Sequence, residues 1–123
     1  MSKFFICSHC GNVIGKVIDK GVPLMCCGVK MQELVPNTVE ASTEKHLPTV
    51  NVDGNTIKVK VGSVAHPMTD EHHISFVYLE TNAGGQRKNL SGAPETEFAL
   101  SSGEKPIAVY AYCNLHGLWK VAL

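Results

Sequence analysis

The chain is organised around one segment near its C-terminus, Tyr112-Cys113-Asn114-Leu115-His116-Gly117-Leu118-Trp119. Its cysteine and histidine stand three residues apart in a polar turn, so a thiolate and an imidazole can reach one metal ion. Apolar runs at 107–112 and 118–123 flank the turn and are predicted to be strands that hold it rigidly. Alone, such a pair is more often structural than metal-binding, so the prediction depends on the remaining histidines.

Three further histidines, His46, His66 and His72, fall in predicted loops of the same region. A β-sandwich gathers its loops at its two ends, so ligands that are remote in sequence can meet there. Four imidazoles and one thiolate are too many for structural zinc, whereas on iron they leave one octahedral position for a small molecule. His73 competes with His72. Because adjacent residues in an extended segment point to opposite sides, only one of them should ligate, and spacing does not choose between them.

Residues 1–36 are predicted to form a small first domain around four cysteines, which are Cys7, Cys10, Cys26 and Cys27. A segment this short buries too little apolar surface to fold alone, and a metal would supply the missing cohesion. The spacing resembles that of a zinc ribbon, except that the two cysteines of the second pair are adjacent in sequence. Because adjacent side chains must spread apart to reach one ion, the sequence predicts a distorted site. Four thiolates fit zinc or a single iron.

Residues 37–123 are predicted to form a second domain, an antiparallel β-sandwich of immunoglobulin-like type with about seven short strands. The side-chain period is two, and helix signals are nearly absent, so the chain is expected to be all-β. Alternating apolar residues at 50–52 and 57–61 flank a hairpin turn at Asp53-Gly54-Asn55. Further strands are expected at 74–80, 95–100, 107–112 and 118–123.

Composition narrows the function classes. The 123 residues are 44% hydrophobic and 18% charged, which is typical of a globular protein. Eleven basic and eleven acidic residues cancel, which argues against a nucleic-acid partner. No apolar run reaches the roughly 20 residues that cross a bilayer, and the N-terminus is too polar for a signal peptide. A cytoplasmic location is therefore expected, and in a reducing compartment five cysteines are better read as ligands than as disulfides.

The motifs together resemble desulfoferrodoxin, the two-iron class of superoxide reductase, over essentially the full length. They are Cys7-x2-Cys10, Cys26-Cys27-Gly28, Glu44-Lys45-His46-Leu47-Pro48, His66-Pro67-Met68, Glu71-His72 and Cys113-Asn114-x-His116-Gly117-x-Trp119. The resemblance implies a desulforedoxin-like first domain with iron bound by Cys7, Cys10, Cys26 and Cys27. It also implies a second iron with His46, His66, His72 and His116 in a plane and Cys113 axial. The family pattern selects His72 over His73, which stands where relatives commonly have an aromatic residue.

The activity implied by the resemblance is one-electron reduction of superoxide to hydrogen peroxide at the ferrous second centre, as part of oxidative-stress defence. A rubredoxin-like donor would then re-reduce the iron, and family members are typically homodimers. Lys45 would attract the anion and orient a water, and Glu44 would close the sixth position of the oxidised iron; from the residues alone, both are solvated loop charges. The alternatives are a non-catalytic iron protein for electron transfer or storage, and a zinc-stabilised interaction module.

Overall fold

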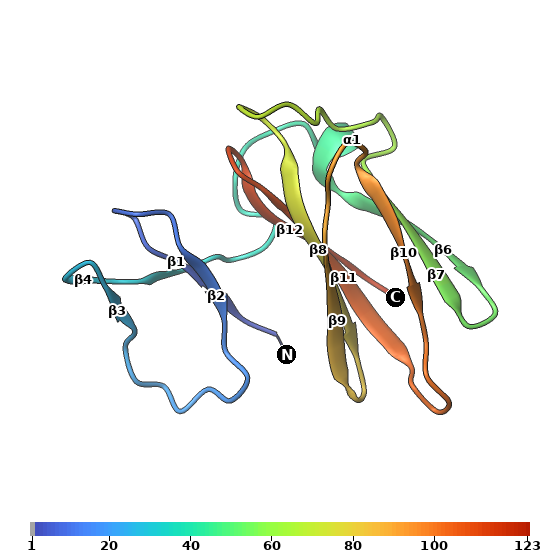
Figure 1. Ribbon diagram of the computed structural model, residues 1–123, viewed down its shortest axis with the longest axis horizontal. Helices are drawn as coiled ribbons and strands as arrows, with labels where there is room; N and C mark the ends of the chain where they lie inside the picture. Colours follow the sequence, from blue (N-terminus) through green and yellow to red (C-terminus); the bar gives the residue numbers. More distant parts are fainter. Residues whose placement is uncertain (1) are drawn as a thin grey trace. The chain divides into compact units, whose positions relative to one another are not determined.

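The computed structural model describes residues 2–123, and the chain forms two compact units that divide between Val35 and Pro36 (Figure 1). The first unit is built from very short strands. Its three-stranded antiparallel sheet has the order β2-β1-β5, and a separate hairpin pairs β3 with β4. The bounds are β1 Phe4–Ile6, β2 Val13–Gly15, β3 Met25–Cys26, β4 Val29–Lys30 and β5 Gln32–Glu33.

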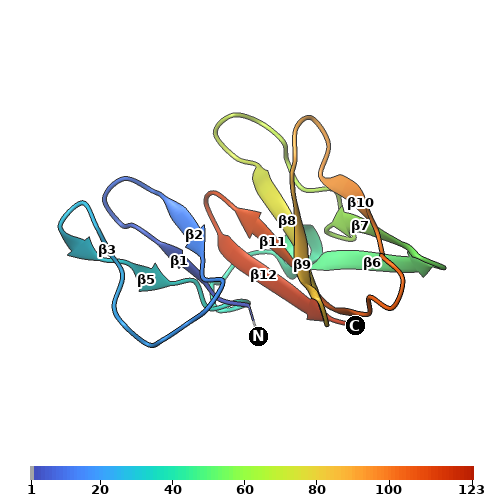
Figure 2. The same cartoon turned by 60° about the horizontal axis from the view of Figure 1, so that its bottom comes forward.

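The second unit is an antiparallel sandwich. One sheet has the order β10-β7-β6 and the other the order β12-β11-β8-β9, as Figures 1 and 2 show. The bounds are β6 Pro48–Asp53, β7 Thr56–Val61, β8 Ile74–Thr81, β9 Gly84–Asn89, β10 Glu95–Ala99, β11 Pro106–Cys113 and β12 Gly117–Ala122. These seven strands, counted within the described residues, confirm the predicted all-β sandwich. The described part of the chain has no helix that is long and apolar enough to span a membrane.

Two elements of this unit were not predicted. Strand β9, with the sequence GGQRKN, has no apolar alternation, because it is an edge strand that β8 holds through main-chain pairing. The segment Thr43–His46 forms one helical turn, α1, where the sequence pattern indicated no helix. A single turn is too short to show a helical period.

The core lies between the two sheets and reaches the end that carries the histidine loops. Inward-facing residues of both sheets are buried, and they are Ile57, Val59, Val61, Ile74, Val77, Leu79, Phe98, Val109, Ala111 and Cys113. A register shift between β8 and β11 decides how this end is packed. Tyr112 pairs with Phe76 but Cys113 pairs with Ile74, so Ser75 is an extra residue on β8. The bulge turns the Ile74 side chain inward and brings Cys113 to the edge of the core.

Candidate metal centres

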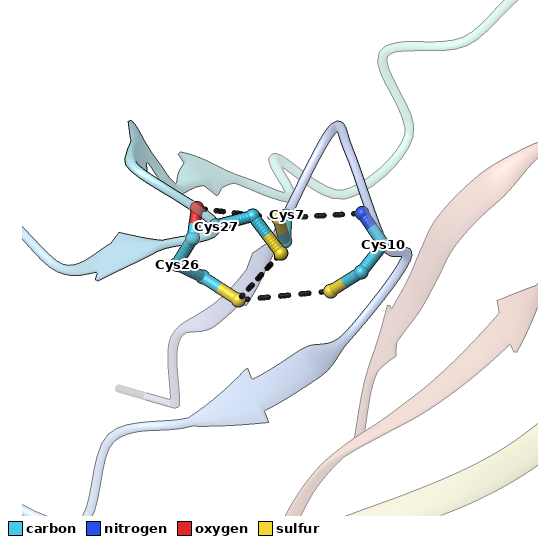
Figure 3. Close-up of side chains that lie close together, drawn as sticks. All are labelled: Cys7, Cys10, Cys26 and Cys27. Carbon is cyan, nitrogen blue, oxygen red and sulfur yellow. Dashed lines mark hydrogen bonds between the residues drawn. The ribbon is translucent and has the colours of Figure 1, made fainter.

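The first candidate centre consists of the four cysteines of the first unit, whose sulfur atoms all lie within 4.8 Å of one another (Figure 3). The Sγ–Sγ distances are 3.6 Å between Cys10 and Cys26 and 3.9 Å between Cys26 and Cys27. A tetrahedral metal with bonds of about 2.3 Å to sulfur requires sulfur–sulfur edges of about 3.8 Å. The four thiols therefore fit one tetrahedral ion, and all four are free cysteines.

Backbone N–H groups of the first unit favour negative charge on two of these cysteine sulfurs. The N–H of Cys10 points at Cys7 Sγ, and the N–H of Asn12 points at Cys10 Sγ, both at 3.5 Å. The Cys10 N–H is the main cause that lowers the pKa of Cys7 to about 6. By contrast, the neighbouring Cys10 sulfur raises the pKa of Cys27 to about 12. Four thiols this close cannot all ionise unless a cation compensates their charge.

The adjacent cysteines are accommodated by an unusual backbone. Cys27 has a φ of 54° and Gly28 a φ of 72°, so two successive residues are left-handed. Glycine adopts this conformation easily, whereas a cysteine is strained there. This backbone conformation lets the side chains of the neighbouring residues Cys26 and Cys27 direct their sulfur atoms to the same side, as Figure 3 shows.

The second candidate centre lies at one end of the sandwich. His46 ends α1, His66 and His72 lie in the connection between β7 and β8, and Cys113 and His116 flank the turn between β11 and β12. Figure 1 shows α1 and the β7–β8 connection at the same end of this unit. His46, His66 and Cys113 are buried, and His72 and His116 are half-buried.

The four histidine rings form a closed square. Neighbouring ring centroids are 4.6–5.1 Å apart in the order His46, His66, His72, His116, whereas His46 and His72 are 6.2 Å apart across the diagonal. His46 Nε2 is 3.2 Å from His66 Nε2 and 3.1 Å from His116 Nδ1. Four nitrogens placed about 2.1 Å from a central ion would have neighbours about 3.0 Å apart. The square therefore has the size of a metal–imidazole plane.

The protonation of two of these rings shows that their contact is not a hydrogen bond. His46 Nδ1 lies 2.7 Å from Ser42 O, and His66 Nδ1 lies 2.7 Å from Pro67 O. A carbonyl oxygen only accepts, so each Nδ1 carries the proton and each Nε2 presents a lone pair. The two lone pairs face each other and repel unless a cation lies between them. Backbone carbonyls that fix the outer ring nitrogen are the usual companions of metal-bound histidine.

His72 and Cys113 complete the set. Among the described residues, His72 Nε2 is the buried side-chain polar atom that has no hydrogen-bond partner. The ligand atoms of His46, His72, Cys113 and His116 lie within 4.8 Å of one another, and Cys113 Sγ is 3.8 Å from His116 Nδ1. His73 lies outside this group, and its Nδ1 donates to Thr69 O at 2.9 Å.

Burial keeps three of these imidazoles in the neutral form that can bind a cation. It lowers the pKa of His66 to about 4 and also lowers the pKa of His46 and His72, so these imidazoles are neutral ligands near pH 7. Burial raises the pKa of the Cys113 thiol, while the backbone N–H groups of Leu115 and His116 oppose this. A metal ion therefore supplies the charge that stabilises the thiolate. The close group contains three imidazoles and the Cys113 sulfur, and His66 adjoins it with its Nε2 3.2 Å from His46 Nε2. Imidazoles with one thiolate are a donor set that fits iron.

Glu44 and Lys45 are exposed residues of α1, directly before His46. The positive charge of Lys45 contributes to lowering the pKa of both His46 and His72, after burial as the main cause. Lys45 is thus close enough to act electrostatically on the histidine square. The side chain of Glu44 is solvated, while its carbonyl accepts from Val64 N at 3.0 Å.

Two residues that support this end were given no role by the sequence argument. Gly62 has a φ of 85°, and a Cβ there would lie 2.6 Å from Glu44 O and 2.7 Å from Lys45 O. Trp119 stacks on His46 with centroids 5.0 Å apart and donates its indole N–H to His116 O at 3.1 Å. A glycine directly after an alternating strand is a signal for Gly62, but its contact with α1 requires the tertiary structure.

Comparisons with known proteins agree with this geometry. The family model described as Desulfoferrodoxin matches residues 38–122. A desulfoferrodoxin of Syntrophotalea carbinolica is 44% identical and covers 92% of this chain and 90% of that protein. One of Nitratidesulfovibrio vulgaris is 38% identical over 96% of this chain and 94% of its own. A solved superoxide reductase of Treponema pallidum superimposes with a TM-score of 0.83 at 41% identity, covering 98% of each chain. The chain therefore belongs to the desulfoferrodoxin family.

Proposed function

We propose that this protein is a superoxide reductase, which converts one superoxide, one electron and two protons into hydrogen peroxide. The observation that carries the proposal is the square of four imidazoles with a cysteine sulfur beside it. Iron bound there would supply the electron and one position for the substrate anion. Proteins of similar sequence and structure that bear the name superoxide reductase support this assignment.

The ligands that we propose fall into two sets. Cys7, Cys10, Cys26 and Cys27 hold the first iron, and His46, His66, His72, His116 and Cys113 hold the second. The two sets share no residue, and we propose that the chain has two domains, residues 1–36 and 37–123.

The chain's own residues divide the work at the second centre. Cys113 belongs to the buried core cluster, so its sulfur approaches the square from the protein interior. Lys45 and Glu44 are exposed and directly precede His46, which supports a role for them in meeting a small anion from solvent. We assign to the Lys45 ammonium the attraction of superoxide and the holding of a water that delivers protons. We assign Glu44 a role in the resting oxidised site, where its carboxylate would compete with solvent for the position that the substrate otherwise takes.

Partners and location follow from the family. The proposed electron donor is a small rubredoxin-like protein, the proposed assembly is a homodimer, and the proposed compartment is the cytoplasm. The first centre, a four-thiolate site, suits one-electron transfer and has no further ligand position for substrate.

The decisive experiment measures stoichiometry. Iron-loaded, pre-reduced full-length protein is mixed with superoxide under anaerobic conditions, and hydrogen peroxide and dioxygen are quantified. A reductase yields one peroxide per superoxide and no dioxygen, whereas a dismutase releases dioxygen. If the second centre stays reduced after mixing with superoxide and no peroxide forms, the protein is an electron-transfer protein. In that case azide and cyanide should not bind at that centre either.

A further inference from the structure

The side chain of Asn114, which lies between Cys113 and Leu115, makes an unusual set of hydrogen bonds around His72. Its Oδ1 accepts from His73 N at 2.9 Å, and its Nδ2 donates to Glu71 O at 3.0 Å. The backbone N–H of Asn114 also donates to His73 O at 3.2 Å. One planar amide therefore holds the peptide units on both sides of His72.

The backbone of His72 itself is fixed from the other direction. Its N–H donates to Thr69 Oγ1 at 3.0 Å, and its carbonyl accepts from Thr69 N at 2.9 Å. With Asn114 on one side and Thr69 on the other, the main chain at His72 has little freedom left. The imidazole that extends from it carries the buried, unpartnered Nε2 described above.

We infer that Asn114 is a positioning residue of the second metal centre, which locks the His72 loop onto the turn that carries Cys113 and His116. Those two segments are about forty residues apart in sequence, and Asn114 joins them by two side-chain hydrogen bonds. The amide is not a ligand. It fixes where the His72 nitrogen stands relative to the sulfur of Cys113 before any ion binds, and outer partners of this kind typically change metal affinity 10- to 100-fold.

The chain contains a matched control at the other end of the same sandwich. Asn82 Oδ1 accepts from Lys105 N at 2.7 Å, its Nδ2 donates to Gly103 O at 3.2 Å, and its backbone N–H donates to Lys105 O at 3.1 Å. The residue held between these peptides is Glu104, which belongs to neither ligand set. Both asparagines are exposed, so the two clamps are alike in geometry and solvation and differ in what they hold.

The test compares Asn114→Ala with Asn82→Ala in full-length protein loaded anaerobically with ferrous iron. Affinity is measured by competition with a chelator, and occupancy of the second centre is read after oxidation from its visible ferric–thiolate absorption. Iron in the four-cysteine centre of the same molecule serves as an internal reference. Unfolding of the metal-free proteins by urea reports the purely structural effect.

Both variants should lose a similar, small amount of stability, because each loses the same two exposed hydrogen bonds. Asn114→Ala alone should bind iron about 10- to 100-fold more weakly at the second centre and shift its absorption band. Asn82→Ala should stay within about twofold of the parent. Equal iron affinities in the two variants would overturn the inference, whether both are weakened or neither is.

If Asn114→Ala fails to fold, Asn114→Asp decides the question, because it keeps the size and the acceptor oxygen but loses the donor to Glu71 O. It too should release iron more readily, and parental affinity would overturn the inference. The inference rests on the proposed function, but the two fail differently. A parent protein that takes up no iron at the second centre refutes the function. A parent that binds iron and reduces superoxide, beside Asn114 variants of equal iron affinity, refutes only the role of Asn114.

Discussion

Replacing Gly62 by alanine is expected to unfold the end of the sandwich that carries α1. The φ of 85° costs an alanine about 1–2 kcal/mol. The new methyl group would also overlap the carbonyl oxygen of Val64 and lie 2.6 and 2.7 Å from the carbonyl oxygens of Glu44 and Lys45, all closer than the Cβ atoms of folded proteins approach such oxygens. These are backbone atoms that cannot rotate away, so α1 and the segment at Val64 must move apart, which adds about 1–3 kcal/mol. The free energy of unfolding should therefore fall by about 2–5 kcal/mol, and iron at the second centre should be lost because His46 moves with α1.

Gly92 separates the two contributions to this loss. Its φ is 84°, nearly that of Gly62, but a Cβ there would meet nothing within 4 Å. Gly92→Ala should therefore lose only the conformational part, about 1–2 kcal/mol, and keep its iron. Urea unfolding of the metal-free proteins can be followed by the fluorescence of Trp119, the single tryptophan, which lies in the second unit beside His46. Equal losses of stability in the two variants, with iron retained in both, would refute the packing argument.

Three further predictions test the proposed function. Lys45→Ala should slow the second-order reaction with superoxide roughly tenfold and flatten its dependence on ionic strength, whereas Lys45→Arg should retain most of the rate. Pulse radiolysis at several salt concentrations measures these rates, and an unchanged rate and salt dependence would show that Lys45 has no role in the reaction. Cys7→Ser should disable the first centre and leave superoxide reduction by the pre-reduced second centre intact, while Cys113→Ser should do the reverse; a folded Cys7→Ser protein that keeps its second iron yet does not react contradicts the assignment. Complete removal of metal should unfold the first unit and leave the second folded, which amide hydrogen exchange can resolve; protection of the first unit in metal-free protein would contradict this.

Much of the fold follows from side-chain alternation. Ile57, Val59 and Val61 alternate with lysines, and the structure buries all three in β7. Strand β9 was missed because its polar residues carry no such signal, and its place is decided by main-chain pairing with β8. The turn α1 was missed because it is one turn long and depends on Gly62, which lies after the next two strands in sequence.

The candidate site also has residues that the sequence could identify and residues that it could not. Cys113 and His116 could be paired from their spacing, since both flank one tight turn between two strands. The other histidines lie in loops whose positions are set by long-range contacts. Their place at the ends of predicted strands suggested His46 and His66 and left His72 and His73 as alternatives, and the family resemblance selected His72. The role of Asn114 could not be seen at all, because its partners lie more than forty residues away.

The two candidate centres differ in how far the surrounding unit depends on the metal for its stability. In the first unit, the buried hydrophobic residues among those described are Phe4, Cys7 and Met31, and Cys7 belongs to the proposed ligand set. So small a core cannot offset the entropy of ordering some 35 residues, so we expect metal binding there to be part of folding. The sandwich has a buried cluster of ten core residues among those described, so we expect its strands to stay folded without metal. His46 and His66 therefore face each other with opposed lone pairs while the fold keeps them in place, and their repulsion favours a cation that enters the square.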